Sequence, residues 1–227
     1  KLTTSYDYLN PYLVLILEYI LKNNIKLKLS DFLEKWIKEK INYILKSLID
    51  LRNLKESNSS IKALAYQLYE NNGVVKRSDV NQIVKSIPAE EKKKLWGFGI
   101  KIGRYHIYLP KMLKPKAVEF RIGLWKLFRN LPTVNKIPQS GLNFLINNRF
   151  EKDFLLLCGF EKFGEFFVRI DILERLLLKI IELSKQYKFE LNSEILNLLG
   201  CTKYDFKVLM NKMNYKCVVK EKKMFFK

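Results

Sequence analysis

The chain has 227 residues, 48% of them hydrophobic and 29% charged, which is the balance of a globular protein with one large domain or two to three small ones. Its 42 lysines and arginines outnumber its 23 acidic residues, and the formal net charge of +19 favours an acidic partner. Three cysteines without a CxxC spacing and a single histidine support neither a disulfide framework nor a zinc site. No apolar run is long enough to cross a bilayer, so we expect a cytoplasmic protein without a membrane segment.

The positive charge is concentrated in two parts of the sequence. Residues 58–131 carry 15 basic and 5 acidic residues, and residues 203–227 carry 8 basic and 2 acidic ones, whereas residues 132–202 carry 9 of each. A genome poor in G and C raises the lysine content everywhere, but it does not leave one long stretch neutral. The location of the charge therefore indicates two basic surfaces.

The first part of the chain, residues 1–57, is predicted to be a helical segment. Pro11 precedes an apolar run that predicts a helix of about a dozen residues. Asp31 and Glu34 have the spacing of a capping box, so a long amphipathic helix is expected to begin at Asp31.

The signals between residues 60 and 109 come in a definite order. A helix is predicted to end at Asn72-Gly73, a two-residue extended piece follows, and Ser78 and Pro88 begin two short helices. Apolar residues then alternate on both sides of Gly103-Arg104, which predicts a β-hairpin.

The C-terminal part repeats this order. An amphipathic helix from Asp171, a short extended piece, a helix ended by Gly200, a helix opened by Thr202 with Asp205, and a second hairpin follow one another. A shift of 115 residues places one series on the other without a gap. Helix, short strand, helix, turn, helix and two-stranded ribbon is the order of a winged helix, whose last helix enters a groove while the hairpin contacts the nucleic-acid backbone.

We therefore predict a mainly α protein with short β-hairpins, in which two winged-helix-like modules are joined by a linker. The predicted division is an N-terminal helical segment (residues 1–57), a first module with the helix that follows it (58–130), a linker (131–150) and a second module (151–227). The linker is placed where Pro132, Pro138 and the Ser140-Gly141 pair gather.

The candidate nucleic-acid-binding residues are those on and around the third helix and hairpin of each module. Lysine is a strongly hydrated point charge that suits phosphates better than base edges, and Tyr105 would stack on an unpaired base. The alternatives are a solvated surface for the lysines, core or rim packing for Tyr105, and protein docking by the second module. The candidates are Lys92, Lys93, Lys94, Lys101, Arg104, Tyr105, Lys111 and Lys114 in the first module, and Lys203, Lys207, Lys216, Lys220, Lys222 and Lys223 in the second.

The sequence offers no catalytic centre. It contains no phosphate-binding loop, no GxGxxG fingerprint and no nucleophile elbow. His106 is expected on the surface of a strand rather than in an active site. Asp171 and Glu174 lie in a first helical turn, where the helix dipole accounts for two acids without catalysis.

Three stretches resemble one family, the alphaproteobacterial superfamily-two helicases related to the mitochondrial degradosome RNA helicase, in their C-terminal region. The first is residues 95–125, LWGFGIKIGRYHIYLPKMLKPKAVEFRIGLW, with its Gly-x-Tyr, Leu-Pro, Leu-Lys-Pro and Leu-Trp elements. The second is residues 159–176, GFEKFGEFFVRIDILERL, and the third is residues 196–202, LNLLGCT. Together the resemblance covers about residues 30–218.

The resemblance implies a parent protein with two helicase motor lobes upstream, which would bind ATP and Mg²⁺ and unwind RNA or DNA. No motor motif lies in this chain, and the first methionine is Met112, so we expect a fragment without ATPase activity of its own, needing no cofactor. Its expected partners are RNA or DNA and the motor lobes, and its oligomeric state is open. The alternatives are a tandem winged-helix replication initiator or transcription regulator, and a protein-docking scaffold. Residues 88–97 contain no Arg, Asn or Gln to read base edges, which favours nonspecific binding.

Overall fold

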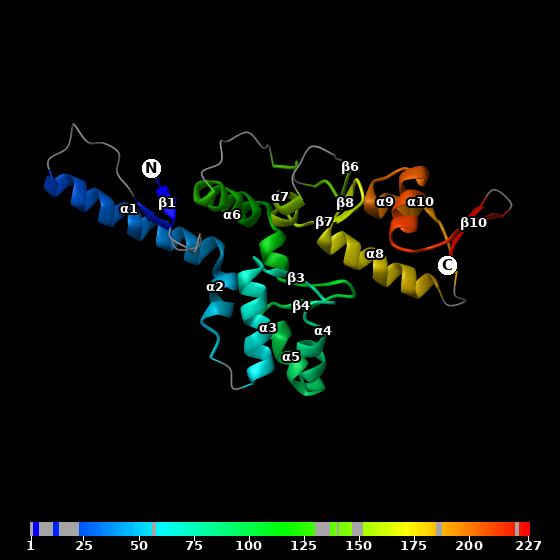
Figure 1. Ribbon diagram of the computed structural model, residues 1–227, viewed down its shortest axis with the longest axis horizontal. Coiled ribbons are helices and arrows are strands. Elements are labelled where there is room, and N and C mark those ends of the chain that lie inside the picture. The colour runs from blue at the N-terminus through cyan, green and yellow to red at the C-terminus, as the bar shows by residue number, and fades with distance from the viewer. Residues whose placement is uncertain are drawn as a thin grey trace.

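The computed structural model describes residues 2–4, 11–13, 23–55, 58–129, 137–139, 141–146, 152–184, 188–220 and 223–227. In these residues the protein is mainly helical, with small antiparallel sheets, three of them three-stranded. Figure 1 shows an elongated molecule with α1 at one end and the C-terminal hairpin at the other. None of the described helices is both long enough and apolar enough to span a membrane.

The N-terminal part differs from the sequence-based prediction at both of its elements. Residues 11–13 form a strand rather than the start of a helix, because β2 (Pro11–Leu13) pairs antiparallel with β1 (Leu2–Thr4), and a proline without an N–H is tolerated at the first position of a strand. The rest of the predicted first helix falls on residues 14–22, outside the described ranges.

The long helix is present, but it does not begin at Asp31. α1 (Asn23–Ile44) starts eight residues earlier, because no proline or glycine separates Asn23 from Asp31 and the capping-box spacing is incidental. The helix is interrupted at Leu45, and a second helix, α2 (Lys46–Arg52), follows directly.

The first repeated unit follows the predicted order. It consists of α3 (Ser59–Glu70), β3 (Val74–Lys76), α4 (Asn81–Ser86), α5 (Ala89–Gly97), β4 (Lys101–Ile102) and β5 (His106–Tyr108), with β5 hydrogen-bonded between β3 and β4. Asn72 and Gly73, with φ of 59° and 84°, end α3 in the left-handed conformation as predicted. Ser78 does not cap α4, because its hydroxyl donates to Asp79 and the residue before the helix is Val80.

The middle of the chain forms a compact junction. A 3-10 turn (Pro110–Leu113) leads into α6 (Pro115–Phe128), and α7 (Lys152–Leu157) precedes a sheet in the order β6-β8-β7. Its strands are β6 (Phe144–Ile146), β7 (Phe160–Phe163) and β8 (Phe166–Arg169). β6 lies within residues 131–150, so part of the predicted linker is a strand paired with β8.

The second repeated unit has the same topology as the first. It consists of α8 (Ile170–Leu183), β9 (Phe189–Glu190), α9 (Ser193–Leu199), α10 (Lys203–Lys212), β10 (Cys217–Lys220) and β11 (Lys223–Phe226), with β11 hydrogen-bonded between β10 and β9. The predicted helix ends are confirmed here: Gly200 has φ of 72°, and Thr202 with Asp205 forms a reciprocal capping box.

Three clusters of buried side chains among the described residues hold these parts together. The first runs from Ile37 to Leu124 and includes α2, α3 and the first hairpin, and the second runs from Phe163 to Phe226. The third lies between α6, α7 and the β7–β8 hairpin, where Val118 and Ile122 contact Phe154 and its neighbours. α6 and the β7–β8 hairpin therefore each contribute to two cores and join the repeated units.

Candidate nucleic-acid interface

The basic candidates of the first unit face solvent but share their helix with acids. Lys93 and Lys94 of α5 are exposed and Lys92 is half-buried. The first turn of α5 contains Glu90 and Glu91, and Lys94 forms an ion pair of 4.0 Å with Glu91. The net charge of α5 is therefore only slightly positive. Lys101, Lys111 and Lys114 are also exposed, in β4, the 3-10 turn and the start of α6.

The tip of the first hairpin is held by a carboxylate from the second unit. Glu174 of α8 accepts hydrogen bonds from the backbone N–H groups of Arg104, Tyr105 (2.9 Å) and His106 (2.6 Å). Successive N–H groups in a turn can bind an anion, and here the anion is a carboxylate of the same chain. The side chain of Arg104 still faces solvent, but its backbone is fixed against α8.

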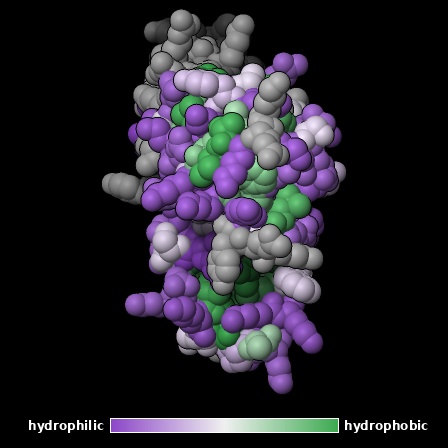
Figure 2. Space-filling view, turned by 90° about the vertical axis from the view of Figure 1, so that its right-hand side faces the viewer, coloured by the Kyte–Doolittle hydropathy of each residue, from purple (hydrophilic) through white to green (hydrophobic). Residues whose placement is uncertain are grey.

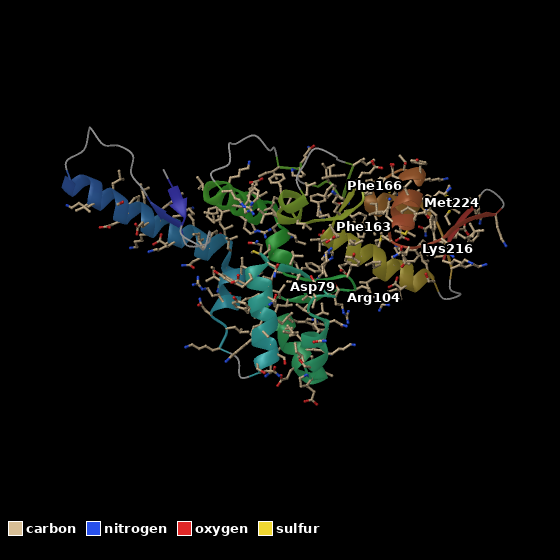
Figure 3. All side chains as sticks on the ribbon, viewed as in Figure 1. Asp79, Arg104, Phe163, Phe166, Lys216 and Met224 are labelled. Atoms are coloured by element: carbon tan, nitrogen blue, oxygen red, sulfur yellow. The ribbon has the colours of Figure 1, made fainter. Side chains whose placement is uncertain are left out.

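Tyr105 also belongs partly to this junction. Its side chain is 36% exposed, its ring lies 5.8 Å from that of Phe163, and the ammonium of Lys76 lies 6.0 Å from its centroid. Figure 3 shows Arg104 in the hairpin below α8 and Phe163 next to α8. Only part of the Tyr105 ring is accessible for stacking on a base.

His106 is buried, not on a strand surface as its alternation predicts. Its side chain is 1% exposed, and Nε2 lies 2.8 Å from Oε2 of Glu161 on β7. Glu161 also forms an ion pair with Lys76, with 2.9 Å between Oε1 and Nζ. Nδ1 of His106 lies 3.5 Å from Oε1 of Glu174. The helix dipole does not account for Glu174 either, because its carboxylate is enclosed in this network. Both predictions were wrong because residues 55 to 70 positions away cover the strand.

The four charges shift one another's pKa values in a consistent direction. Burial lowers the pKa of His106, but the hydrogen bond to Glu161 and the negative charge of the nearby Glu174 outweigh burial, and the pKa lies above its ordinary value. Burial raises the pKa of both carboxylates, but their donors outweigh it. His106 and Lys76 bring the pKa of Glu161 below its ordinary value, and His106 and the hairpin N–H groups do the same for Glu174. The hydrogen bond to Glu161 raises the pKa of Lys76. The network is therefore charged at neutral pH, with Lys76, Glu161 and Glu174 ionised.

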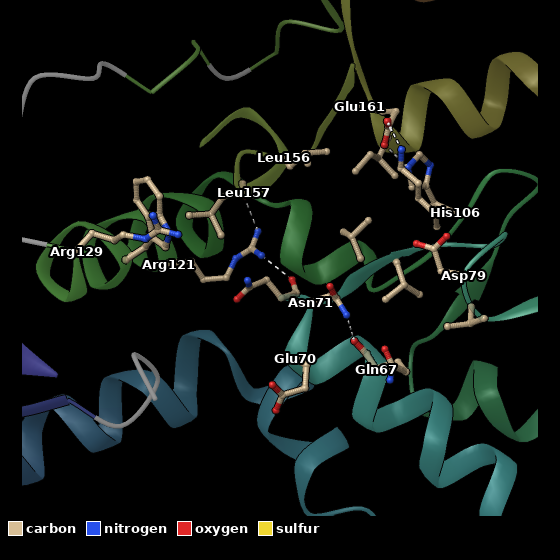
Figure 4. Close-up of a pocket in the computed structure, with 17 residues that line it drawn as sticks. Gln67, Glu70, Asn71, Asp79, His106, Arg121, Arg129, Leu156, Leu157 and Glu161 are labelled. Atoms are coloured by element: carbon tan, nitrogen blue, oxygen red, sulfur yellow. Dashed lines mark hydrogen bonds and ion pairs between the residues drawn. The ribbon is translucent and has the colours of Figure 1, made fainter. Parts of the chain in front are cut away.

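A cleft of about 520 Å³ opens beside this network, between α3, β3, α6 and α7 (Figure 4). Its polar lining is largely paired within the protein, since the amide of Asn71 donates to the carbonyl of Gln67 and Glu161 holds Lys76 and His106. The guanidinium of Arg121, 1% exposed, donates to the carbonyls of Asn72, Met112 and Leu157. Arg121 thus ties the first unit to α7, and the cleft belongs to the junction.

The second hairpin is not enclosed in this way. β10 and β11 extend from the end of the molecule in Figure 1, and Figure 2, which faces that end, shows hydrophilic residues with small hydrophobic patches between them. Lys203, Lys216, Lys220 and Lys223 are exposed, Lys207 is half-buried, and Lys222 falls outside the described residues. Lys223 forms an ion pair of 3.0 Å with Glu190. The sequence-based candidates therefore fall into two separate groups. The hairpin of the first group is bound by Glu174, whereas the described lysines of the second hairpin are exposed.

Within the described ranges, no group of three or more His, Cys, Asp or Glu is arranged to hold a metal ion. Burial raises the pKa of Cys158 to about 12 and that of Cys201 to about 11, so both thiols are protonated at neutral pH. No protein family, curated protein or solved structure matches the chain.

Proposed function

We propose that this chain is an accessory nucleic-acid-binding region of an ATP-dependent RNA or DNA helicase, built from two winged-helix-like units. The observation that carries the proposal is the repeated topology: each unit runs helix, strand, helix, helix, hairpin, with the last strand in the middle of its sheet. Both basic segments of the sequence contain the third helix and hairpin of a unit. That placement is the one that phosphate contact requires.

The second unit is the main phosphate-binding surface in this proposal. Its third helix, α10, carries Lys203, Lys207 and Lys212 with one acid, and its hairpin adds Lys216 and Lys220 in exposed positions. The first unit contributes less, because α5 has two acids in its first turn and its hairpin is bound by Glu174. The motor lobes, with ATP and Mg²⁺, would precede this region.

The test is a titration of labelled single-stranded RNA, single-stranded DNA and duplex DNA, followed by fluorescence anisotropy between about 50 and 200 mM salt. Nonspecific binding would have a Kd on the order of 10⁻⁴ to 10⁻⁶ M and a steep salt dependence. Replacing Lys203, Lys216 and Lys220 by Gln is expected to reduce the slope of log K against log salt by about 0.7 to 0.9 for each phosphate that the variant no longer neutralises.

The matched control removes the same charge elsewhere. Lys28, Lys35 and Lys62 are exposed on α1 and α3, and their replacement by Gln is expected to leave the slope nearly unchanged. An equal decrease in both triple variants would mean that only the overall charge matters. Absence of binding to all three nucleic acids would favour the protein-docking alternative. The helicase part has a separate test, since the gene sequence before Lys1 is expected to encode a phosphate-binding loop and a DExH box.

A further inference from the structure

The outer face of the C-terminal sheet combines an aromatic ring with several cations. In the β10–β11 ladder, Val218 is opposite Phe225 and Lys220 is opposite Lys223. Side chains alternate between the faces of a strand, so these four share one face. The neighbouring Phe226 points to the other face, where it is fully buried and stacks on Phe189 at 5.4 Å. Phe225 therefore lies on the central strand of the sheet and away from the core.

A recess of about 290 Å³ lies on this side of the sheet. It is lined by Lys188, Val218, Lys220, Phe225, Phe226 and Lys227. The ammonium of Lys188 lies 5.7 Å from the centroid of Phe225, so this lysine lies over one face of the ring. The acid on this face, Glu190, is opposite Phe225 and holds Lys223 at 3.0 Å. Among the described residues that line the recess, no side chain carries a carboxylate.

We propose that this recess takes one unpaired base of a single-stranded nucleic acid, stacked on Phe225, while Lys188 and Lys220 contact the adjoining phosphates. The proposal rests on the proposed nucleic-acid-binding function and specifies its substrate as single-stranded. The recess is at the small end of the range of ligand pockets, which suits one planar ring system. A base in a duplex is covered on both faces by its neighbours, so only an unpaired base offers its π-face to a side chain.

Lys188 can move from the ring of Phe225 to a phosphate when a base binds. Its side chain is exposed, and an exposed lysine is flexible enough to move its ammonium from the ring to a phosphate beside the stacked base. The ammonium of Lys188 then interacts with the full negative charge of a phosphate rather than with the partial negative charge of the ring face. Val218, 40% exposed, supplies an aliphatic edge next to the ring.

The experiment compares two single strands of equal length and charge, one with bases and one made of abasic sites. Phe225→Leu keeps an apolar side chain of similar bulk but removes the ring. We expect this variant to lose about 5- to 150-fold in affinity for the strand with bases, and to bind the abasic strand as the unchanged protein does. A 2-aminopurine base in the strand should be quenched on binding to the unchanged protein and much less by the variant.

The control variant is Phe120→Leu, since Phe120 is a half-buried phenylalanine of α6 outside the recess. It should not distinguish the two strands, and circular dichroism should show both variants folded. If the unchanged protein binds both strands equally and Phe225→Leu changes neither, the stacking site is wrong and the electrostatic function stands. If neither strand binds at low salt, the proposed function fails as well.

Discussion

The carboxylate of Glu174 occupies the space into which a side chain at position 103 would project. A Cβ placed on Gly103 would lie 2.3 Å from that carboxylate and 2.7 Å from the carbonyl oxygen of His106. The hairpin turn of the first unit and α8 of the second are thus fitted to each other at one point, and the absence of a side chain on Gly103 is what allows the contact.

Gly103→Ala is therefore expected to destabilise the protein by steric displacement of Glu174. Overpacking of this kind costs about 1 to 3 kcal/mol in the free energy of unfolding. Urea denaturation followed by circular dichroism measures the change. Gly123→Ala is the control: Gly123 lies in α6 with open space around its Cα, and an alanine there should be neutral or stabilising by up to about 1 kcal/mol. Equal stability of Gly103→Ala and the unchanged protein would contradict the close approach.

Glu174→Ala should be among the most damaging single changes in the chain. It leaves three backbone N–H groups of the hairpin turn without their acceptor and His106 without one of its two carboxylates. Breaking a buried, charged interaction of this type costs about 3 to 5 kcal/mol. Glu174→Gln, which keeps an acceptor oxygen but not the charge, should be less destabilising. Glu182→Gln, at an exposed position on the same helix, should stay within about 0.5 kcal/mol.

The charge network also predicts how stability changes with pH. The raised pKa of His106 stabilises the folded protein fully below the ordinary value of 6.5, and this contribution is lost as the pH rises through the folded pKa. The lowered pKa values of Glu161 and Glu174 act above 4.5, and their contribution is lost as the pH falls below it. The network therefore stabilises most between pH 4.5 and 6.5.

Unfolding measured by urea at a series of pH values tests this window. His106 is the only histidine, so His106→Gln should remove most of the decline in stability above pH 6.5 and leave the acid side in place. A decline above pH 6.5 that is unchanged in His106→Gln would show that another group causes it.

Arg121→Met tests the contact between the first unit and α7. The variant keeps an apolar stem of similar length, but the carbonyls of Asn72, Met112 and Leu157 no longer receive a charged donor. Leaving buried acceptors unsatisfied costs about 1 to 3 kcal/mol each, so we expect a clear fall in the urea midpoint. Lys116→Met, at an exposed position of the same helix, is the comparison and should have little effect.

The sequence predicted those parts of the fold whose signals are local. The helix end at Gly200, the capping box of Thr202 and Asp205, and the hairpin around Gly103 each depend on residues within a few positions of one another, and each is confirmed. The mainly helical composition and the two hairpins follow from them. At Asp31 a local signal misled, because a capping-box spacing arises by chance inside a helix that has no breaker before it.

The parts that the sequence did not predict depend on distant segments. His106 alternates as a surface residue would, but all three residues of β5 are buried, because Glu161 and Glu174 reach the sheet from later parts of the chain. Burial of Arg121 has the same origin, since one of its three acceptors is Leu157. The candidate lysines were chosen by their charge and by their place on the third helix and hairpin, and neither property indicates which hairpin is bound by another part of the chain.

α6 contributes to two hydrophobic cores, and this affects how the protein unfolds. Ala117 and Leu124 belong to the first core and Val118 and Ile122 to the third, so opening this helix would expose apolar surface of both at once. Regions that share buried surface open together in hydrogen exchange. The β7–β8 hairpin joins the third core to the second in the same way, so the two repeated units should melt in a single transition, with the amides of α6 among the last to exchange. The separated halves should each be less stable than the whole.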